Sequence, residues 1–330
     1  MNKFLFSLLL IILFSCSSNN INTPEETSST FKPKGLFSSS FGNESALDNN
    51  QVKGSLIRVK WSDLEPSKGV YDFSKINQFL IAIKSRNLKW SLGIIAGGDS
   101  PDWLIDSFGA TYFEINGIDN TIKRIPKIWD SKVNERLTYL AQALEEAYAN
   151  DEDLVLIYVP QMTANGIEGH FNGVTNTELI NTGFTADKWV NSVKETAKIF
   201  ANSFSNKAIA VEVHDIINDT SIPNRIITDL WNDSSLNKRV GAAMWWISGK
   251  TTYQPNLINV LSDFPGDIYA QAIGRSDQIE RFKDNDYTSI FSQAQTIGIR
   301  YIELWEYEFV NNTFSAAFEN FNNYTQLSFD

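Results

Sequence analysis

The chain is poor in the side chains that most often build crosslinks and metal centres, with one cysteine, Cys16, and two histidines in 330 residues. A single cysteine excludes a disulfide framework within the chain. The cysteine and histidine inventory is also too small for a structural metal site, so no metal and no cofactor are expected. Acidic residues outnumber basic ones, 39 against 28, giving a formal net charge of -11. Nucleic-acid binding needs a positive surface, so a nucleic-acid partner is not expected.

Several catalytic motifs are missing as well. The sequence has no GxSxG turn, phosphate-binding loop or HExxH, so the serine hydrolase, nucleotide hydrolase and zinc peptidase classes lose their usual signatures. The stretch SSSFGNES is not the Gly-rich turn of a dinucleotide-binding sheet. What the chain does have is aromatic side chains: 9 Trp, 11 Tyr and 22 Phe. Such rings fill cores or form flat platforms for sugar faces.

The N-terminus predicts an exported lipoprotein. Residues 1–15 combine Lys3 with a short apolar run, which is typical of a signal peptide and too short for a membrane span. The sequence LFSC at 13–16 resembles a lipobox, in which Cys16 is acylated. Residues 16–34 are polar and are expected to form a flexible tether. We therefore expect an outer-membrane lipoprotein facing the periplasm or the cell surface.

Residues 35–330 predict one (β/α)8 barrel. Apolar runs that suit buried strands alternate with amphipathic stretches that suit helices, such as 185–204, where Thr185 is a candidate N-cap. Eight strand-like runs in one domain-sized segment indicate a closed parallel barrel. The first crossover is expected to be irregular. The runs span residues 35–41, 56–61, 89–97, 154–161, 208–215, 240–248, 267–274 and 300–309.

In such a barrel the ligand-binding side chains follow the C-terminal ends of the strands. Carboxylates mixed with amides, histidines and tryptophans at that rim favour a carbohydrate site. Trp245 and Trp246 are adjacent, so only one of them can face the barrel interior. The candidate substrate-binding residues are Trp61, Asp99, Trp103, Gln161, Asn165, His170, Glu212, His214, Trp245, Gln271, Arg275 and Trp305.

Glycoside hydrolysis needs two carboxyl groups, one protonated and one ionised. Glu168 is the predicted acid, because its Gly-flanked, largely uncharged setting (NGIEGHF) favours a pKa raised by desolvation. For the second group, strand alternation places Glu303 and Trp305 on one face and Glu306 on the other. A carboxylate inside a barrel strand is costly unless it is functional or paired, which favours Glu303 over Glu306. A structural ion pair remains the alternative for Glu303.

Two stretches carry a family resemblance. RVKWSDLEPSKGVYDFSKINQFL (58–80) and LKWSLGIIAGGDSPDWL (88–104) resemble the second and third strand regions of clan A glycoside hydrolases, particularly family 42 β-galactosidases. The resemblance implies a glycosidase barrel with an acid/base glutamate in an Asn-Glu pair after strand four, and a glutamate nucleophile after strand seven. Here Ile167 precedes Glu168, and the seventh run offers Gln271 but no glutamate.

Two functions follow from this pattern. The first is a monomeric glycoside hydrolase acting on a polysaccharide or oligosaccharide, with Glu168 as acid and Glu303 as the second carboxylate. The second is a glycan-binding surface lipoprotein that keeps the barrel without catalysis. The missing glutamate after strand seven favours the second function, and the carboxylates of the eighth strand favour the first.

Overall fold

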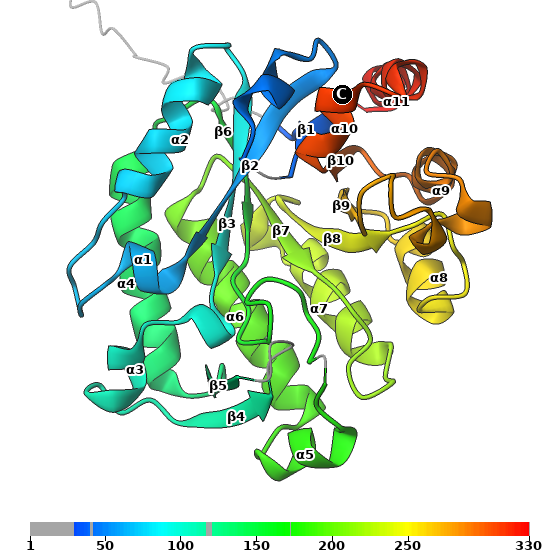
Figure 1. Cartoon of the computed structure of the whole chain (residues 1–330). Helices are drawn as coiled ribbons and strands as arrows, with labels where there is room; N and C mark the ends of the chain where they lie inside the picture. Colours follow the sequence, from blue (N-terminus) through cyan, green and yellow to red (C-terminus); the bar gives the residue numbers. More distant parts are fainter. Residues whose placement is uncertain (1–29, 40–41, 117–120, 172, 330) are drawn as a thin grey trace, which may run out of the picture.

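The computed structural model describes residues 30–39, 42–116, 121–171 and 173–329 (Figure 1). The predicted signal peptide and Cys16 lie outside these residues. Within the described part of the chain, no helix is both long and apolar enough to cross a membrane.

Eight parallel strands close into a barrel, which confirms the predicted fold class. Going around the barrel, the order is β1-β10-β9-β8-β7-β6-β3-β2. The barrel closes where the first strand pairs with the last, from Gly35 opposite Tyr301 to Ser38 opposite Leu304. Each predicted run contributes one strand: β1 (Gly35–Ser38), β2 (Val52–Lys60), β3 (Lys89–Ile95), β6 (Leu154–Tyr158), β7 (Ala208–Glu212), β8 (Val240–Ile247), β9 (Ile268–Ala272) and β10 (Tyr301–Leu304).

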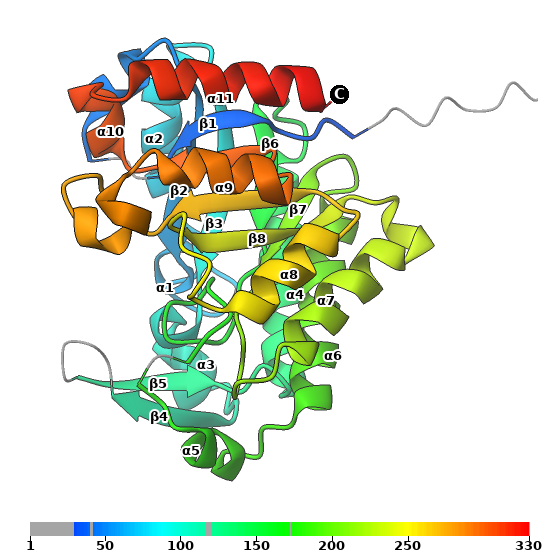
Figure 2. The same ribbon diagram turned by 90° about the vertical axis from the view of Figure 1, so that its right-hand side faces the viewer.

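Helices cover the outside of the barrel, as Figure 2 shows for α7, α8, α9 and α11. Thr185 caps α6 by accepting a hydrogen bond from the Lys188 amide, as predicted. The first crossover is only a 3-10 helix, Glu44–Asp48, which confirms its irregularity. The outer helices are α2 (Ser74–Lys84), α4 (Ser131–Tyr148), α6 (Ala186–Ser203), α7 (Ser221–Asn232), α8 (Pro255–Asp263), α9 (Ser289–Ile297) and α11 (Ser315–Ser328).

The last predicted strand is shorter than expected. β10 ends at Leu304, and Trp305 precedes helix α10 (Glu306–Asn311). Two glutamates in the first turn of α10 interact favourably with the partial positive charge of a helix N-terminus. The prediction that residues 305–308 alternate along a strand is therefore wrong, and Glu306 belongs to a helix.

An antiparallel hairpin that the sequence analysis missed lies in the long connection after β3. Its strands are β4 (Tyr112–Asn116) and β5 (Ile122–Pro126). It lies beside the short helices α3 (Asp102–Asp106) and α5 (Asn176–Asn181), with α1 (Trp61–Leu64) nearby (Figure 1). These elements follow β2, β3 and β6, so they extend the C-terminal mouth of the barrel, where ligand sites of this fold lie.

The core has two parts. One lies inside the barrel and includes Tyr158, Tyr269, Tyr301 and Trp245. The larger part lies between the strands and the helices and includes Trp246. The adjacent tryptophans therefore face opposite sides of β8, as strand alternation predicted.

The stretch after β2 is held by a buried ion pair. Glu65 is completely buried and pairs with Arg136 of α4. It also accepts hydrogen bonds from Trp61 Nε1 (3.0 Å) and from the Gly69 amide (2.8 Å), while Trp103 Nε1 donates to the Glu65 carbonyl (2.9 Å). These contacts leave the fully buried Trp61 no face for a ligand. Trp103 is only partly buried, so its binding role stays a prediction.

Candidate active site

The loop that carries Glu168 is fixed against the end of β3. Gly166 has φ 74°, and a Cβ there would lie 2.3 Å from the Ala96 nitrogen. The Gly166 carbonyl accepts hydrogen bonds from the amides of Gln161 (2.8 Å) and Ala96 (3.3 Å). Only glycine combines this backbone conformation with so close an approach. The loop backbone is therefore restricted to one path, which places Glu168 at the mouth of the barrel.

Gln161 ties the same loop to the next strand. Its side-chain nitrogen donates to the carbonyls of Ile167 and Glu212, each at 2.8 Å. Gln161 is buried and its amide is engaged, so it positions the loop and is not placed to bind a sugar as predicted.

Glu168 has the surroundings of an ionised carboxylate. Asn165 Nδ2 donates to its Oε1 at 2.9 Å, and its Oε2 lies 2.9 Å from His170 Nε2. Its side chain is 25% exposed. Burial raises the pKa of Glu168, but the hydrogen bond and charge of His170, together with His214, outweigh it and hold the pKa below its usual value. The expectation of a raised pKa is therefore wrong, because it counted desolvation alone.

A second carboxylate–histidine pair lies beside the first. Glu212, at the end of β7, accepts hydrogen bonds from the amides of Gly169 (2.7 Å) and Trp245 (3.2 Å), and its Oε2 is 2.9 Å from His214 Nδ1. The rings of His170 and His214 meet edge to face with centroids 4.5 Å apart. Burial and the charge of Glu168 raise the pKa of Glu212, and burial lowers the pKa of His214 to about 3.

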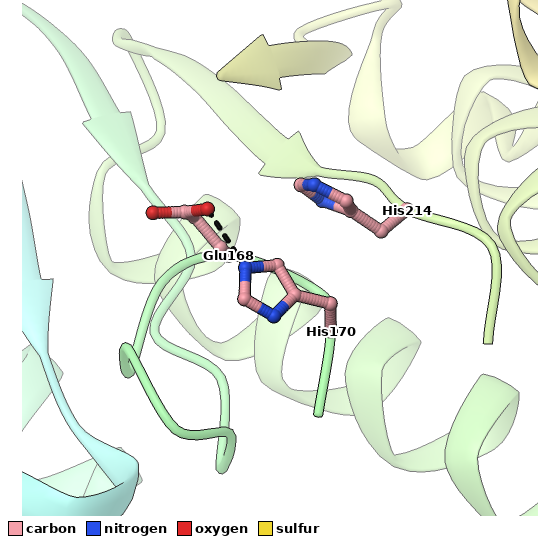
Figure 3. A group of neighbouring side chains, drawn as sticks. All are labelled: Glu168, His170 and His214. Atoms are coloured by element: carbon pink, nitrogen blue, oxygen red, sulfur yellow. Dashed lines mark hydrogen bonds and ion pairs between the residues drawn. The ribbon is translucent and has the colours of Figure 1, made fainter. Parts of the chain in front are cut away.

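Three of these side chains could hold a cation. One ligand atom from each of Glu168, His170 and His214 lies within 4.8 Å of the other two (Figure 3). The sequence argument against a metal counted only cysteine and histidine. The fold adds a glutamate to the two histidines, so a three-ligand set exists after all.

Glu303 lies inside the barrel. It is completely buried and accepts hydrogen bonds from Tyr158 Oη (2.9 Å), Tyr301 Oη (2.6 Å) and Gln271 Nε2 (2.8 Å). Burial raises the pKa of Glu303 to about 7, and these hydrogen bonds oppose the rise. Gln271, predicted to bind substrate, thus contacts this carboxyl group.

Arg58 of β2 interacts electrostatically with both Glu168 and Glu303. Burial lowers the pKa of Arg58, while the charges of Glu303 and Glu168 oppose that change. Its guanidinium carbon lies 5.7 Å from the centroid of the Trp305 ring. The sequence analysis missed Arg58, although its position two residues after the inward-facing Leu56 was a usable signal.

A pocket of about 690 Å³ opens beside β10 and is lined by Arg275, Trp305 and Glu306, among others. Trp305 is partly exposed there and donates through Nε1 to the Ala272 carbonyl at 3.0 Å. The Glu306 carboxylate accepts hydrogen bonds from the amides of Gly42 and Asn43, at 2.7 and 2.8 Å. It holds the loop after β1, so its carboxylate is less available for chemistry than predicted.

Two further predicted residues have partners of their own. Asp99 forms a salt bridge with Lys60 at 2.7 Å. Trp245 is only 5% exposed, with its ring against Tyr158 at a centroid distance of 4.9 Å, so it is covered and unavailable as a sugar platform. The structure thus brings together Asn165, Glu168, His170, Glu212 and His214 at one centre, and Gln271 and Glu303 at another.

Comparisons with known proteins bear on the fold of the chain. The glycoside hydrolase family 42 model, described as β-galactosidase, matches residues 49–165, about a third of the chain. Among solved structures, the catalytic domain of β-amylase from Paenibacillus polymyxa is similar, with a TM-score of 0.63 and 11% identity over 90% of this chain and 99% of that one. A search of curated proteins found no match. At that identity the structural likeness shows the fold alone, a (β/α)8 barrel.

Proposed function

We propose that this glycoside hydrolase-like barrel hydrolyses a glycosidic bond of a polysaccharide or oligosaccharide, using Glu168 and Glu303. The observation that carries the proposal is a partly exposed carboxylate, Glu168, at the mouth, with a second carboxyl group, Glu303, inside the barrel and the charge of Arg58 near both. The similarity to the β-galactosidase family and to a β-amylase supports glycosidic bonds as the target.

The surroundings of the two groups suggest opposite roles. The contacts of Glu168 hold its pKa below the usual value, so this carboxylate is ionised and suits a nucleophile or base. Glu303 has a pKa of about 7, so it holds a proton in mildly acidic solution and suits the acid. Gln271 fits either state of Glu303, because its amide can turn its nitrogen or its oxygen toward the carboxyl group. This assignment exchanges the roles expected from the sequence.

The proposal requires the bound sugar to uncover Glu303. Its carboxyl group is fully covered by neighbouring side chains, and a catalytic acid must reach the leaving oxygen. Trp305, half-buried at the edge of the larger pocket and stacked near Arg58, is the aromatic surface best placed to guide a sugar there.

Hydrolysis of a glycan panel tests the proposal. The panel includes galactosides, starch and related oligosaccharides, and the assay measures released reducing ends and binding on the same samples. Glu168→Gln should lower the rate by about 10²- to 10⁴-fold while binding persists. Glu195→Gln, on the exposed face of α6, is the matched control and should keep full activity.

A glycan-binding protein without catalysis is the second candidate, and the complete burial of Glu303 favours it. It predicts glycan binding without released sugar, identical in the wild type and in Glu168→Gln. That outcome on substrates that bind would overturn the hydrolase proposal.

The lipoprotein assignment remains a proposal from the sequence, because Cys16 lies outside the described residues. It places the barrel on a tether at the outer membrane, where extracellular or periplasmic glycans are within reach.

A further inference from the structure

The two histidines of the chain lie side by side, and the hydrolase proposal does not require them to. His170 comes from the loop after β6 and His214 from the segment after β7 (Figure 3). Glu168 lies next to His170, and Glu212 lies next to His214. Both rings are at least nine-tenths buried. We propose that Glu168, His170 and His214 bind a divalent transition-metal ion, with zinc as the best-fitting species.

The donor set and spacing fit such an ion. Zinc prefers imidazole nitrogen and carboxylate oxygen at about 2.0–2.2 Å, and tetrahedral geometry then separates the ligand atoms by roughly 3.3 Å. Glu168 Oε2 and His170 Nε2 are already 2.9 Å apart, and all three ligand atoms lie within 4.8 Å of one another. Side-chain movements of about 1 Å would therefore complete the coordination.

The hydrogen bond behind His214 has the arrangement found in metal sites, whereas His170 Nδ1 is buried and has no hydrogen-bond partner among the described residues. A ligating histidine usually donates its other ring nitrogen to a carboxylate or carbonyl, which fixes the ring and its tautomer. His214 Nδ1 meets the Glu212 carboxylate at 2.9 Å, and Asn165 orients the Glu168 carboxylate through its other oxygen. Among the described residues His214 Nε2 has no hydrogen-bond partner, so this nitrogen is free for an ion.

Two acidic side chains meet at this site. Among the described residues, neither Glu168 nor Glu212 forms a salt bridge with a lysine or an arginine, and each lies against one histidine. A divalent ion between the two loops would bring a positive charge to these side chains.

The site has room for an ion and for a fourth ligand. A pocket of about 400 Å³ is lined by His170, His214 and Asp215, among others. Three protein ligands with an open fourth position are typical of zinc sites that bind water or a substrate oxygen. The turn beside this pocket places Ile217 at φ 52°, a conformation that is rare for a β-branched residue and is often retained at ligand sites.

Metal binding to the whole protein, made without a polyhistidine tag and stripped with a chelator, tests the proposal. Equilibrium dialysis against Zn²⁺, followed by elemental analysis and calorimetry, should give one tightly bound ion per chain. Co²⁺ should bind with the visible absorption of a four-coordinate nitrogen–oxygen site, while Ca²⁺ should not compete, because it prefers six to eight oxygen ligands.

Variants separate this site from adventitious binding. His214→Ala should abolish stoichiometric binding of the ion. Glu212→Gln removes only the carboxylate behind His214 and should lower the affinity for the ion by about 10- to 100-fold. Glu195→Gln should bind like the wild type. Circular dichroism confirms that each variant is folded. Less than a stoichiometric ion in the wild type, or equal affinity in folded His214→Ala, would overturn the proposal. An ion bound through Glu168 would engage the carboxylate that the hydrolase proposal uses as a nucleophile or base, so the two proposals are tested separately. The readout here is metal content, which does not depend on whether any glycan is cleaved.

Discussion

Replacing Glu303 with glutamine should make the stability of the protein less sensitive to pH. Burial raises the pKa of this carboxyl group from 4.5 to about 7. Between those values the folded state binds more protons at this group than the unfolded state does, so the stability that Glu303 contributes is fully present below pH 4.5 and is lost as the pH rises through 7. At about 1.36 kcal/mol per pKa unit, ionised Glu303 costs the folded state about 3 kcal/mol.

Glutamine keeps the shape of the side chain and cannot ionise. Tyr158 and Tyr301 can still donate to its amide oxygen, and Gln271 can turn its own amide to match. Any pH-independent cost of the substitution cancels when the two proteins are compared at two pH values. From pH 5.5 to 8.5, the free energy of unfolding of Glu303→Gln should therefore rise by about 2 kcal/mol relative to that of the wild type.

Urea unfolding followed by tryptophan fluorescence measures this difference, since the linear dependence on denaturant gives the free energy of unfolding at each pH. Glu195→Gln, an exposed substitution of the same type, should show no such trend. A wild-type to Glu303→Gln difference that stays constant within about 0.5 kcal/mol across this range would refute the raised pKa, and with it the suitability of Glu303 as an acid near neutral pH.

Three further predictions concern the loops and the anchor. Arg136→Ala should destabilise the fold by about 3–5 kcal/mol, because it leaves the Glu65 carboxylate buried without its partner; a loss below about 1 kcal/mol in urea unfolding would contradict the structural role. Gly166→Ala should lower the melting temperature more than Gly69→Ala. Both glycines have positive φ, but only a Cβ at position 166 would clash with backbone atoms, those of Ala96; equal shifts would argue against this clash. Cys16→Ala should move the protein from the membrane fraction to the soluble fraction when cells are fractionated, and unchanged membrane association would argue against acylation.

The barrel could be predicted because its signals are local. Each inner strand is an apolar run, and helix limits follow from residues such as Thr185, which accepts the Lys188 amide, and Gly298, whose φ of 86° ends α9. The β4–β5 hairpin was missed because its strands are short and lie in a connection where a helix was expected. Its cross-strand pair Glu114–Arg124 was a readable but weak sign.

The candidate site was only partly predictable, for a different reason. The strand-end rule located Glu168, Glu212 and both histidines, but not their mutual contacts. Whether burial or a hydrogen-bonding partner controls the pKa of Glu168 depends on His170 turning back toward it, which residue order does not reveal. Similarly, Glu303 and Tyr158 are 145 positions apart and meet only because the barrel closes.

The seam between β1 and β10 has a consequence for how the chain reaches its final form. The strand made first, β1, pairs with the strand made last, and Asn322 of α11 adds hydrogen bonds to Leu36 and to Gln51. Until Tyr301 and its neighbours emerge, the edges of β1 and β9 stay unpaired, and such edges are prone to intermolecular pairing. Loss of β10 would leave an open sheet, so the barrel closes only after residues 301–304 have been made.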